Sequence, residues 1–318
     1  AAAITAVAIA GLVSLTASYF ARPLLARLGI LDVPTARSSH STPTVRGGGV
    51  GPLLGISAGM LVVALAGAAT DALVLALIAV SAVAAGLLGL SEDTRGLTIG
   101  VRAATQLLIG LVSAILLGVV LDQPFWMIAL AGVFVAGYIN VTNFMDGING
   151  VSGLHGVIVG TTFAIVGLLA DAPWLAVTGA VIAVAFAGFL PWNLRPPHLF
   201  LGDVGSYLLG AVISVTIVAG IFNGIPAIAV VAPVLVYLTD TSTTLARRIL
   251  QGERWHQAHR SHIYQRLVLV GFSHVQVALY VTAMTGMCAV LGLASLVGSG
   301  PVAGLSTAGI LGVLITYS

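Results

Sequence analysis

The chain has 318 residues, of which 58% are hydrophobic and only 7% are charged, and its mean hydropathy is +1.11. This composition excludes an ordinary water-soluble domain, and nothing in the net charge of +2 indicates a nucleic-acid partner. Apolar runs recur along the whole chain, and ~20 apolar residues are what a helix needs to cross a bilayer. We therefore expect an all-α integral membrane protein.

About eleven transmembrane helices are predicted in one domain that covers residues 1–318, with ten as the alternative count. The expected spans lie near residues 3–21, 48–66, 72–90, 103–121, 125–142, 153–170, 174–192, 206–222, 227–246, 274–296 and 302–318. The first is expected to be a retained span rather than a signal peptide, because no basic segment precedes it. The 39 glycines are expected to allow close helix packing.

All twelve basic residues are arginines, and in this arrangement every one falls on the same side of the membrane. The opposite connections carry only Asp71, Asp122 and Asp171 as charges. By the positive-inside rule the arginine side is cytoplasmic and the N-terminus is outside. Most other polar residues also fall on the arginine side, so we expect the chemistry there.

The first connection on the arginine side runs from Leu31 to Gly49 and couples His40 and Arg46 to a glycine run. Backbone N–H groups at a helix start, together with arginines, can hold an anion such as phosphate. The alternative is a flexible basic loop that touches acidic headgroups. This segment alone does not decide between the two.

The second connection begins with two adjacent carboxylates, Glu92 and Asp93, directly after an apolar run that ends at Leu90. Two charges at the end of a transmembrane helix are costly unless they meet a cation, a metal or water. The alternative is that they are solvated and paired with Arg95 and Arg102.

The third polar segment, Asn140 to Gly150, reads N-V-T-N-F-M-D-G-I-N-G. Its Asn140, Asn143 and Asp146 are three residues apart, so on a helix they project one above another toward a common partner. Lipid cannot be that partner, because unsatisfied polar groups are costly in hydrocarbon. We expect a polar cavity, and a structural hydrogen-bond cluster is the alternative.

The fourth segment, Pro191 to Gly210, joins Asn193, Phe200 and Asp203 to glycines just before a span. Asp203 is placed to bind a hard cation, and the glycines let the backbone approach a ligand closely. The alternative is that Asp203 only caps the following helix.

The fifth segment, Arg247 to Leu267, holds five arginines, one glutamate and the three histidines His256, His259 and His262. It could form an amphipathic helix on the anionic leaflet. Phosphate binding also fits the excess of arginine. A metal site is disfavoured, because the segment supplies no clear additional ligands.

Together these segments resemble the polyprenyl-phosphate N-acetylhexosamine-1-phosphate transferases, the membrane glycosyltransferase family 4. The segments that carry the resemblance are N-V-T-N-F-M-D-G-I-N-G, F-L-P-W-N-L-R-P-P-H-L-F-L-G-D-V-G-S and H-R-S-H-I-Y-Q-R-L. The likeness runs from about Leu31 to Leu267. It is closest to the branch that starts O-antigen, lipopolysaccharide or other surface glycans, and the superfamily also includes the phospho-N-acetylmuramoyl-pentapeptide transferase of peptidoglycan synthesis.

The resemblance implies a multi-pass enzyme of the bacterial inner membrane. It would transfer a sugar-1-phosphate from a UDP-N-acetyl amino sugar to polyprenyl phosphate, expected to be undecaprenyl phosphate, and release UMP. Mg²⁺ is the implied cofactor, with Mn²⁺ as a substitute, and the peptidoglycan relatives suggest a homodimer. A reaction between two phosphate groups agrees with this, because it needs mainly a metal, positive groups and positioning.

The same match assigns roles to residues of this chain. The expected catalytic residues are Glu92, Asp93, Asp203, Asn143, Asp146 and His262, with Asp203 and Asp93 as metal ligands. The expected substrate-binding residues are His40, Arg46, Asn149, Asn193, Phe200, Arg260 and Arg266. The chain departs from the family's pattern where Glu92 replaces Asp, Asn149 replaces Asp, and Tyr264 and Gln265 replace two histidines.

Three other classes of protein are alternatives to this interpretation. A transporter would place its polar groups near the middle of the bilayer rather than at helix ends. A CDP-alcohol phosphotransferase needs a D-G-x-x-A-R motif, and the residues after Asp146 and Gly147 do not match it. A catalytically inactive homologue can be separated only by activity.

Overall fold

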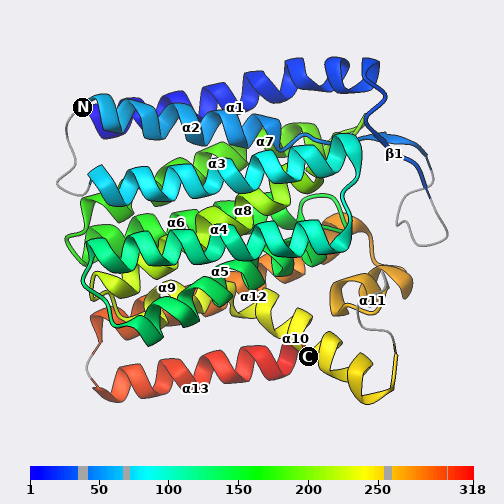
Figure 1. Cartoon of the computed structure of the whole chain (residues 1–318). Helices are drawn as coiled ribbons and strands as arrows, with labels where there is room; N and C mark the ends of the chain where they lie inside the picture. Colours follow the sequence, from blue (N-terminus) through cyan, green and yellow to red (C-terminus); the bar gives the residue numbers. More distant parts are fainter. Residues whose placement is uncertain (35–41, 67–71, 254–259, 299) are drawn as a thin grey trace.

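The fold is a bundle of antiparallel helices that run across the view in Figure 1. The computed structural model describes residues 1–34, 42–66, 72–253, 260–298 and 300–318. Its α-helices are α1 Ala2–Arg27, α2 Val50–Leu65, α3 Ala72–Arg95, α4 Ile99–Val120, α5 Phe125–Met145, α6 Val151–Leu169, α7 Pro173–Leu194, α8 Gly202–Phe222, α9 Ala227–Val231, α10 Leu235–Leu250, α11 Ile263–Leu269, α12 His274–Val297 and α13 Gly300–Tyr317. Two short strands, β1 Leu31–Asp32 and β2 Thr44–Val45, pair antiparallel between α1 and α2.

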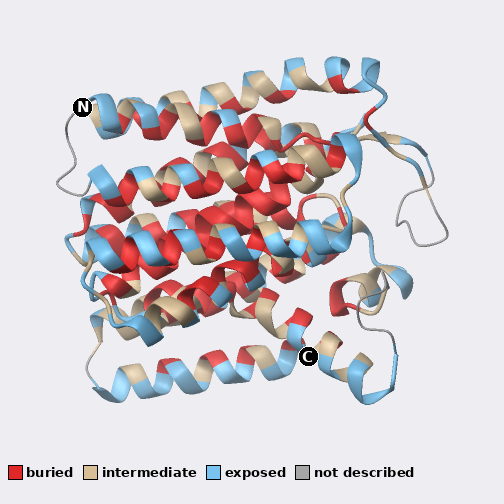
Figure 2. Cartoon of the chain, viewed as in Figure 1, coloured by how far each residue is buried: buried red, intermediate tan, exposed pale blue. Residues whose placement is uncertain are grey.

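The expected all-α membrane architecture is confirmed. Within the described ranges, ten helical segments are long and apolar enough to cross a bilayer. The shorter apolar helix α2, of 16 residues, occupies the place of the second predicted span. The outward faces of peripheral helices such as α1 and α13 are exposed in Figure 2 and carry large apolar side chains, as lipid contact requires.

One predicted span is not a continuous helix. The segment predicted at 227–246 consists of α9, a turn of 3₁₀-helix η1 at Ala232–Val234, and then α10. Pro233 lies inside this turn and has no backbone N–H to donate to the preceding turn, so regular α-helical bonding stops there. A new helix, α10, begins after the break. Its C-terminal end leads into the arginine-rich segment from Arg247 to Leu267.

Helix α8 is the centre of the bundle, because 94% of its apolar window is buried. It packs against α3 and α5 along most of its length. Two glycines allow close approach to the start of α8: a Cβ on Gly89 would clash with the backbone of Asp203, and a Cβ on Gly49 would clash with that of Gly205. These contacts bring the first connection and the end of α3 directly against the start of α8.

The arginines of the described residues all lie at one end of the bundle, which we call the arginine-rich end. It contains the connections at 28–49, 96–98, 146–150, 195–201 and 251–273, together with the adjoining helix termini, and lies on the right in Figure 1. The connections after α4 and α6, at the other end, carry Asp122 and Asp171. For the residues that the structure describes, the predicted segregation of charge is therefore present; Asp71, Arg37 and Arg254 lie outside them.

Candidate functional site

A cavity of about 620 Å³ opens at the arginine-rich end. Its lining brings together five segments that are far apart in the chain. The lining residues are Asp32, Arg46, Asp93, Asn143, Asp146, Gly147, Ile148, Asn149, Asn193, Phe200, Leu201, Gly202, Asp203, Arg260, Gln265, Val268, Leu269 and His274. Nine of the thirteen predicted site residues are in this list, and the size is typical of a pocket for a small-molecule ligand.

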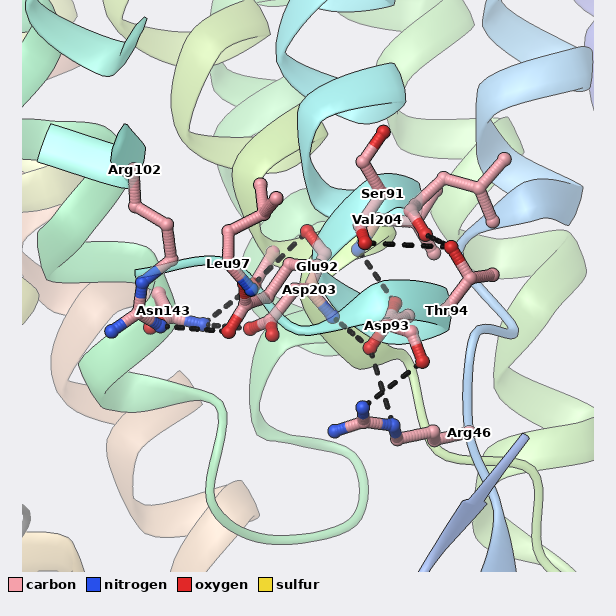
Figure 3. A network of polar contacts seen from close by, with 12 residues as sticks. Arg46, Ser91, Glu92, Asp93, Thr94, Leu97, Arg102, Asn143, Asp203 and Val204 are labelled. Atoms are coloured by element: carbon pink, nitrogen blue, oxygen red, sulfur yellow. Dashed lines mark hydrogen bonds and ion pairs between the residues drawn. The ribbon is translucent and has the colours of Figure 1, made fainter. Parts of the chain in front are cut away.

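Asp203 lies in the first turn of the buried helix α8 and faces α5 (Figure 3). The side-chain nitrogen of Asn143 donates to Asp203 Oδ1 at 2.5 Å and lies 3.1 Å from Ser206 Oγ. These hydrogen bonds therefore hold the carboxylate and the amide together on the floor of the cavity. Within α8 the Asp203 carboxylate accepts from no backbone N–H, so the capping alternative is not supported.

Asp93, and not Asp203, caps the start of α8. Its two carboxylate oxygens accept from the backbone N–H groups of Asp203 and Val204, at 3.1 and 3.0 Å. Arg46 Nε lies 3.5 Å from Asp93 Oδ1, and Arg46 Nη2 donates to the Asp93 carbonyl oxygen at 3.0 Å. The carboxylate is buried, and a negative charge is favourable at the positive end of α8. Its contacts are those of a helix cap, and its role as a metal ligand stays a prediction.

The bonds that Glu92 makes are local. Its Oε2 accepts from the backbone N–H of Leu97 at 2.6 Å, and Arg102 Nη1 lies 3.1 Å from its Oε1. The alternative of pairing with Arg102 thus holds for Glu92 (Figure 3). Glu92 is not part of the cavity lining, and its catalytic role stays a prediction.

Asp146 lies on the cavity floor immediately after the end of α5. Its removal from bulk water, and then the negative charges of Asp203 and Asp93, raise the pKa of this carboxyl to about 7, although the nearby Ser152 hydroxyl opposes the shift. Three carboxylates therefore lie close enough to repel one another. A divalent cation bound by one or two of them would offset the repulsion.

The three polar residues of the third segment do not share one partner. Asn143 and Asp146 line the cavity, but Asn140 donates to Gln106 Oε1 of α4 at 2.6 Å and to the Ala136 carbonyl at 3.0 Å. The prediction of a common direction was wrong for Asn140. Along a helix, a step of three residues rotates the side-chain direction by about 300°, which is short of a full turn. Over two such steps the side-chain direction therefore drifts by more than about 100°, away from the cavity.

The glycine run does not form an open anion site. The N–H groups of Gly48 and Gly49 donate to the carbonyls of Phe200 and Leu201, at 2.9 and 2.8 Å. These bonds, with the close approach of Gly49 to Gly205, place the first connection against the start of α8. Arg46, beside the run, still lines the cavity, so the glycines position the arginine and do not themselves bind the ligand.

Asn193 and Phe200 lie on one wall of the cavity. The Asn193 side chain accepts from the Gly150 N–H at 2.6 Å and donates to the Leu199 carbonyl at 3.0 Å. Both ends of this amide therefore join the end of α7 to the turn before α6. Phe200 keeps its predicted place in the cavity wall.

The opposite wall comes from the segment before α11 and from α11 itself, which supply Arg260, Gln265, Val268 and Leu269. His262 is buried, with its Nδ1 3.0 Å from Asp240 Oδ1, and is outside the cavity lining, as is Arg266. The roles of His262 and Arg266 stay predictions.

His40, another predicted site residue, lies outside the described residues, as do His256 and His259.

Sequence reasoning missed several residues that shape the site. Asp32, Gln265 and His274 line the cavity, and Asp240 and Tyr264 organise the wall opposite its floor. Asp240 had a detectable signal, because it is an aspartate within a predicted span and such residues are rare without a partner. Asp32, Tyr264 and Gln265 lie within the polar segments, where the neighbouring arginines and histidines gave the stronger signal, and His274 lies outside them.

Comparisons with known proteins place the chain among membrane transferases. Residues 74–221 match the model of glycosyl transferase family 4. A decaprenyl-phosphate N-acetylglucosaminephosphotransferase of Mycobacterium tuberculosis is 30% identical over 89% of this chain and 80% of its own length. A probable undecaprenyl-phosphate N-acetylglucosaminyl 1-phosphate transferase of Bacillus subtilis is 28% identical over 84% and 79%.

A further match extends over nearly the full length of another relative. The phospho-N-acetylmuramoyl-pentapeptide-transferase of Desulforudis audaxviator is 28% identical over 93% of this chain and 99% of its own length. The matched regions contain α3 to α8, which carry the acidic floor of the cavity. The chain is a multi-pass membrane protein that belongs to glycosyl transferase family 4.

Proposed function

We propose that the protein transfers an N-acetyl amino sugar-1-phosphate from a UDP-sugar to polyprenyl phosphate. A phosphate oxygen of the lipid would form a bond to the sugar-linked phosphorus of the donor, and the bond from that phosphorus to the UMP oxygen would break. The products would be UMP and a polyprenyl-diphosphate-linked sugar. The observation that carries the proposal is that the carboxylates of Asp203 and Asp146, the amide of Asn143 and the guanidinium groups of Arg46 and Arg260 line one cavity.

Each side of the cavity suits one part of this reaction. Several negative charges meet when a phosphate attacks a diphosphate, so the arginines would bind and orient phosphate oxygens. Phe200 offers an aromatic face against which uracil could pack. Asn149 and Asn193 lie on the same lining and can donate to and accept from a nucleotide.

The floor fits Mg²⁺, with Mn²⁺ as a substitute. Asp203 and Asp146 are the residues we propose to hold it, with Asp93 next to them. Within the described ranges, no three acidic, histidine or cysteine side chains form a ready metal cage. This agrees with Mg²⁺, which commonly takes one or two carboxylates and fills its other positions with water and phosphate oxygens. When bound, the ion would neutralise charge on the phosphates.

The donor is proposed to be UDP-N-acetylglucosamine or a close amino sugar, and the acceptor undecaprenyl or decaprenyl phosphate. The support is the names of the Bacillus and Mycobacterium relatives, which specify N-acetylglucosamine and these two lipids. The product would start a surface glycan at the cytoplasmic membrane. The O-antigen and lipopolysaccharide assignment rests only on the likeness of the sequence motifs.

The arginine-rich end is proposed to face the cytoplasm, where UDP-sugars are made. Single cysteines at Ser91 and Ser261, in a Cys288→Ala background, should react with a membrane-impermeant maleimide only after the cells are opened. Cysteine at Asp122 is the matched control, because it lies at the other end and should react in intact cells. Labelling of either serine position from outside would contradict this orientation.

The reaction is tested with the purified protein in lipid. Release of UMP from a panel of UDP-amino sugars should require both undecaprenyl phosphate and Mg²⁺, and EDTA should abolish it. Asp203→Asn serves as the matched inactive protein. Release of UMP without lipid phosphate, or no release from any donor of the panel, would overturn the proposal.

A further inference from the structure

Asp240, in α10, is the centre of a hydrogen-bond cluster behind the cavity wall. It is completely buried and does not line the cavity. Five groups approach its carboxylate: His262 Nδ1 at 3.0 Å, the N–H of Ile263 at 3.0 Å, the N–H of Tyr264 at 3.3 Å, Tyr317 Oη at 2.7 Å and Thr244 Oγ1 at 3.3 Å. This cluster therefore ties α10, α11 and α13 together.

The cluster determines where α11 lies. Helix α11 covers only Ile263–Leu269, and a helix of about two turns is not stable by itself in water. Asp240 satisfies the N–H groups of its first two residues, and His262, directly before it, contacts the same carboxylate. The start of the helix is thus held by one side chain from another helix.

The opposite side of α11 contacts the cavity floor. Tyr264, which is buried, donates through its hydroxyl to the Phe144 carbonyl at 2.9 Å. A Cβ on Gly147 would clash with this hydroxyl, so the tyrosine fits closely over the turn that contains Asp146. A continuous path of bonded groups therefore runs from Asp240 through Tyr264 to the floor.

The residues that depend on this path form one wall of the cavity. Arg260 and Gln265 supply its polar groups, and Val268 and Leu269 its apolar surface. A sugar nucleotide would fill a cavity of about 620 Å³ from floor to wall, whereas a lipid phosphate would place only its headgroup there. A shift of the wall should therefore affect the donor more than the acceptor.

We propose that Asp240 is a positioning residue that holds this wall, through His262 and Tyr264, at the spacing required by the sugar-nucleotide donor. In this assignment His262 orients α11 and does not exchange protons with the substrates. The inference rests on the proposed function for the identity of the donor. The anchoring itself rests only on the contacts of Asp240.

Asp240→Asn tests the proposal, because the amide keeps the size of the side chain but can accept on only one of its two atoms. We expect the KM for UDP-N-acetylglucosamine to rise about tenfold or more, the scale of losing a hydrogen bond to a charged group. The kcat and the KM for undecaprenyl phosphate should stay within about threefold. Hydrogen exchange of the Ile263–Leu269 amides should accelerate, while that of α5 should not change.

Two further variants keep the test decisive. Thr243→Val is the matched control, because its hydroxyl bonds only to carbonyls of its own helix, and neither kinetics nor exchange should change. Tyr264→Phe removes the hydroxyl that bonds to the Phe144 carbonyl and contacts Gly147, and should raise the donor KM in the same direction, by a smaller factor. If Asp240→Asn is too unstable to purify, Tyr264→Phe decides the question.

Two outcomes would overturn the proposal. The first is unchanged exchange of Ile263–Leu269 in a folded Asp240→Asn protein. The second is a fall in kcat with an unchanged donor KM, together with the same fall in His262→Gln, which would make His262 a catalytic group. If the wild-type protein releases no UMP, the proposed function fails, and the exchange measurement still tests the anchoring by itself.

Discussion

The starts of α8 and α11 are built in the same way. At each, a buried aspartate from another helix accepts from two consecutive backbone N–H groups: Asp93 at the start of α8, and Asp240 at the start of α11. Each carboxylate also has a partner that can carry positive charge, Arg46 in the first case and His262 in the second. Both aspartates thus fix a helix terminus that delimits the cavity.

The two starts differ in what surrounds the aspartate. Asp93 lines the cavity beside Asp203 and is balanced by a guanidinium that is always charged. Asp240 is outside the cavity and is surrounded by groups that lie on elements of the wall or behind it. The same type of backbone contact therefore places the Asp93 charge where it can act on a ligand in the cavity. The Asp240 charge can affect the ligand only through the positions of the elements that it holds.

The largest expected effect is at Asp203, whose carboxylate does not cap a helix. Asp203→Asn should lower turnover at least ~100-fold, equivalent to roughly 2.7 kcal/mol in the barrier, because it removes a charge that a divalent cation needs. The melting temperature should change little, since Asp93 and not Asp203 caps α8. UMP release and a thermal melt on the same sample check both points. Near-normal turnover would remove Asp203 from the metal site.

Asp93→Asn should instead lower stability first. The amide can accept from only one of the two N–H groups at the start of α8, and Arg46 loses its counter-charge. We expect a loss of about 2 kcal/mol in the free energy of unfolding, since Arg46 is partly exposed and keeps some hydration. Denaturant unfolding in detergent measures it. An unchanged unfolding midpoint with lost turnover would restore Asp93 as a metal ligand.

The sequence allowed the bundle and the end that carries the site to be predicted, because both follow from long-range composition. The length of the apolar runs predicts helices, and the arginine distribution predicts their common end. It did not reveal the break at Pro233, since a proline inside an apolar run is compatible with either a kinked or an interrupted span.

The partners within the site could not be predicted in the same way. Adjacent residues on a helix point about 100° apart, so Glu92 and Asp93 reach different neighbours although they follow each other in the chain. The contact between Asp240 and Tyr317 joins positions 77 residues apart. Such contacts depend on how the helices pack, and local sequence patterns do not encode that packing.

The pH dependence of stability should identify Asp146 as an unbalanced charge. Its pKa is raised from 3.8 to about 7 in the folded protein, so the unfolded chain loses this proton first and stability falls as pH rises between about 4 and 7. Asp146→Asn should therefore raise the melting temperature in EDTA at pH 8 by a few degrees, and should have little effect at pH 4. Thermal melts at both values test this. A lower melting temperature for the variant at pH 8 would show that the charge is already balanced.

The smallest effect is expected at Glu92, whose neighbours lie outside the cavity. Glu92→Gln keeps an acceptor for the Leu97 N–H and loses only the ion pair with Arg102, a pair open enough to solvent to contribute less than about 1 kcal/mol. Turnover should stay within about threefold at every pH, and Arg102→Gln should behave alike.

The shorter Glu92→Asp side chain should be no better than Glu92→Gln, since it would have to span both contacts with one methylene fewer. If Glu92 were instead the base that readies the lipid phosphate, Glu92→Gln would be severely impaired. That deficit would shrink as pH rises, because a phosphate with a second pKa of roughly 6 becomes a dianion unaided. Rates of Glu92→Gln, Glu92→Asp and Arg102→Gln from about pH 6 to about pH 9 distinguish a structural ion pair from a catalytic base. An ion pair outside the cavity gives no recovery of the rate as pH rises.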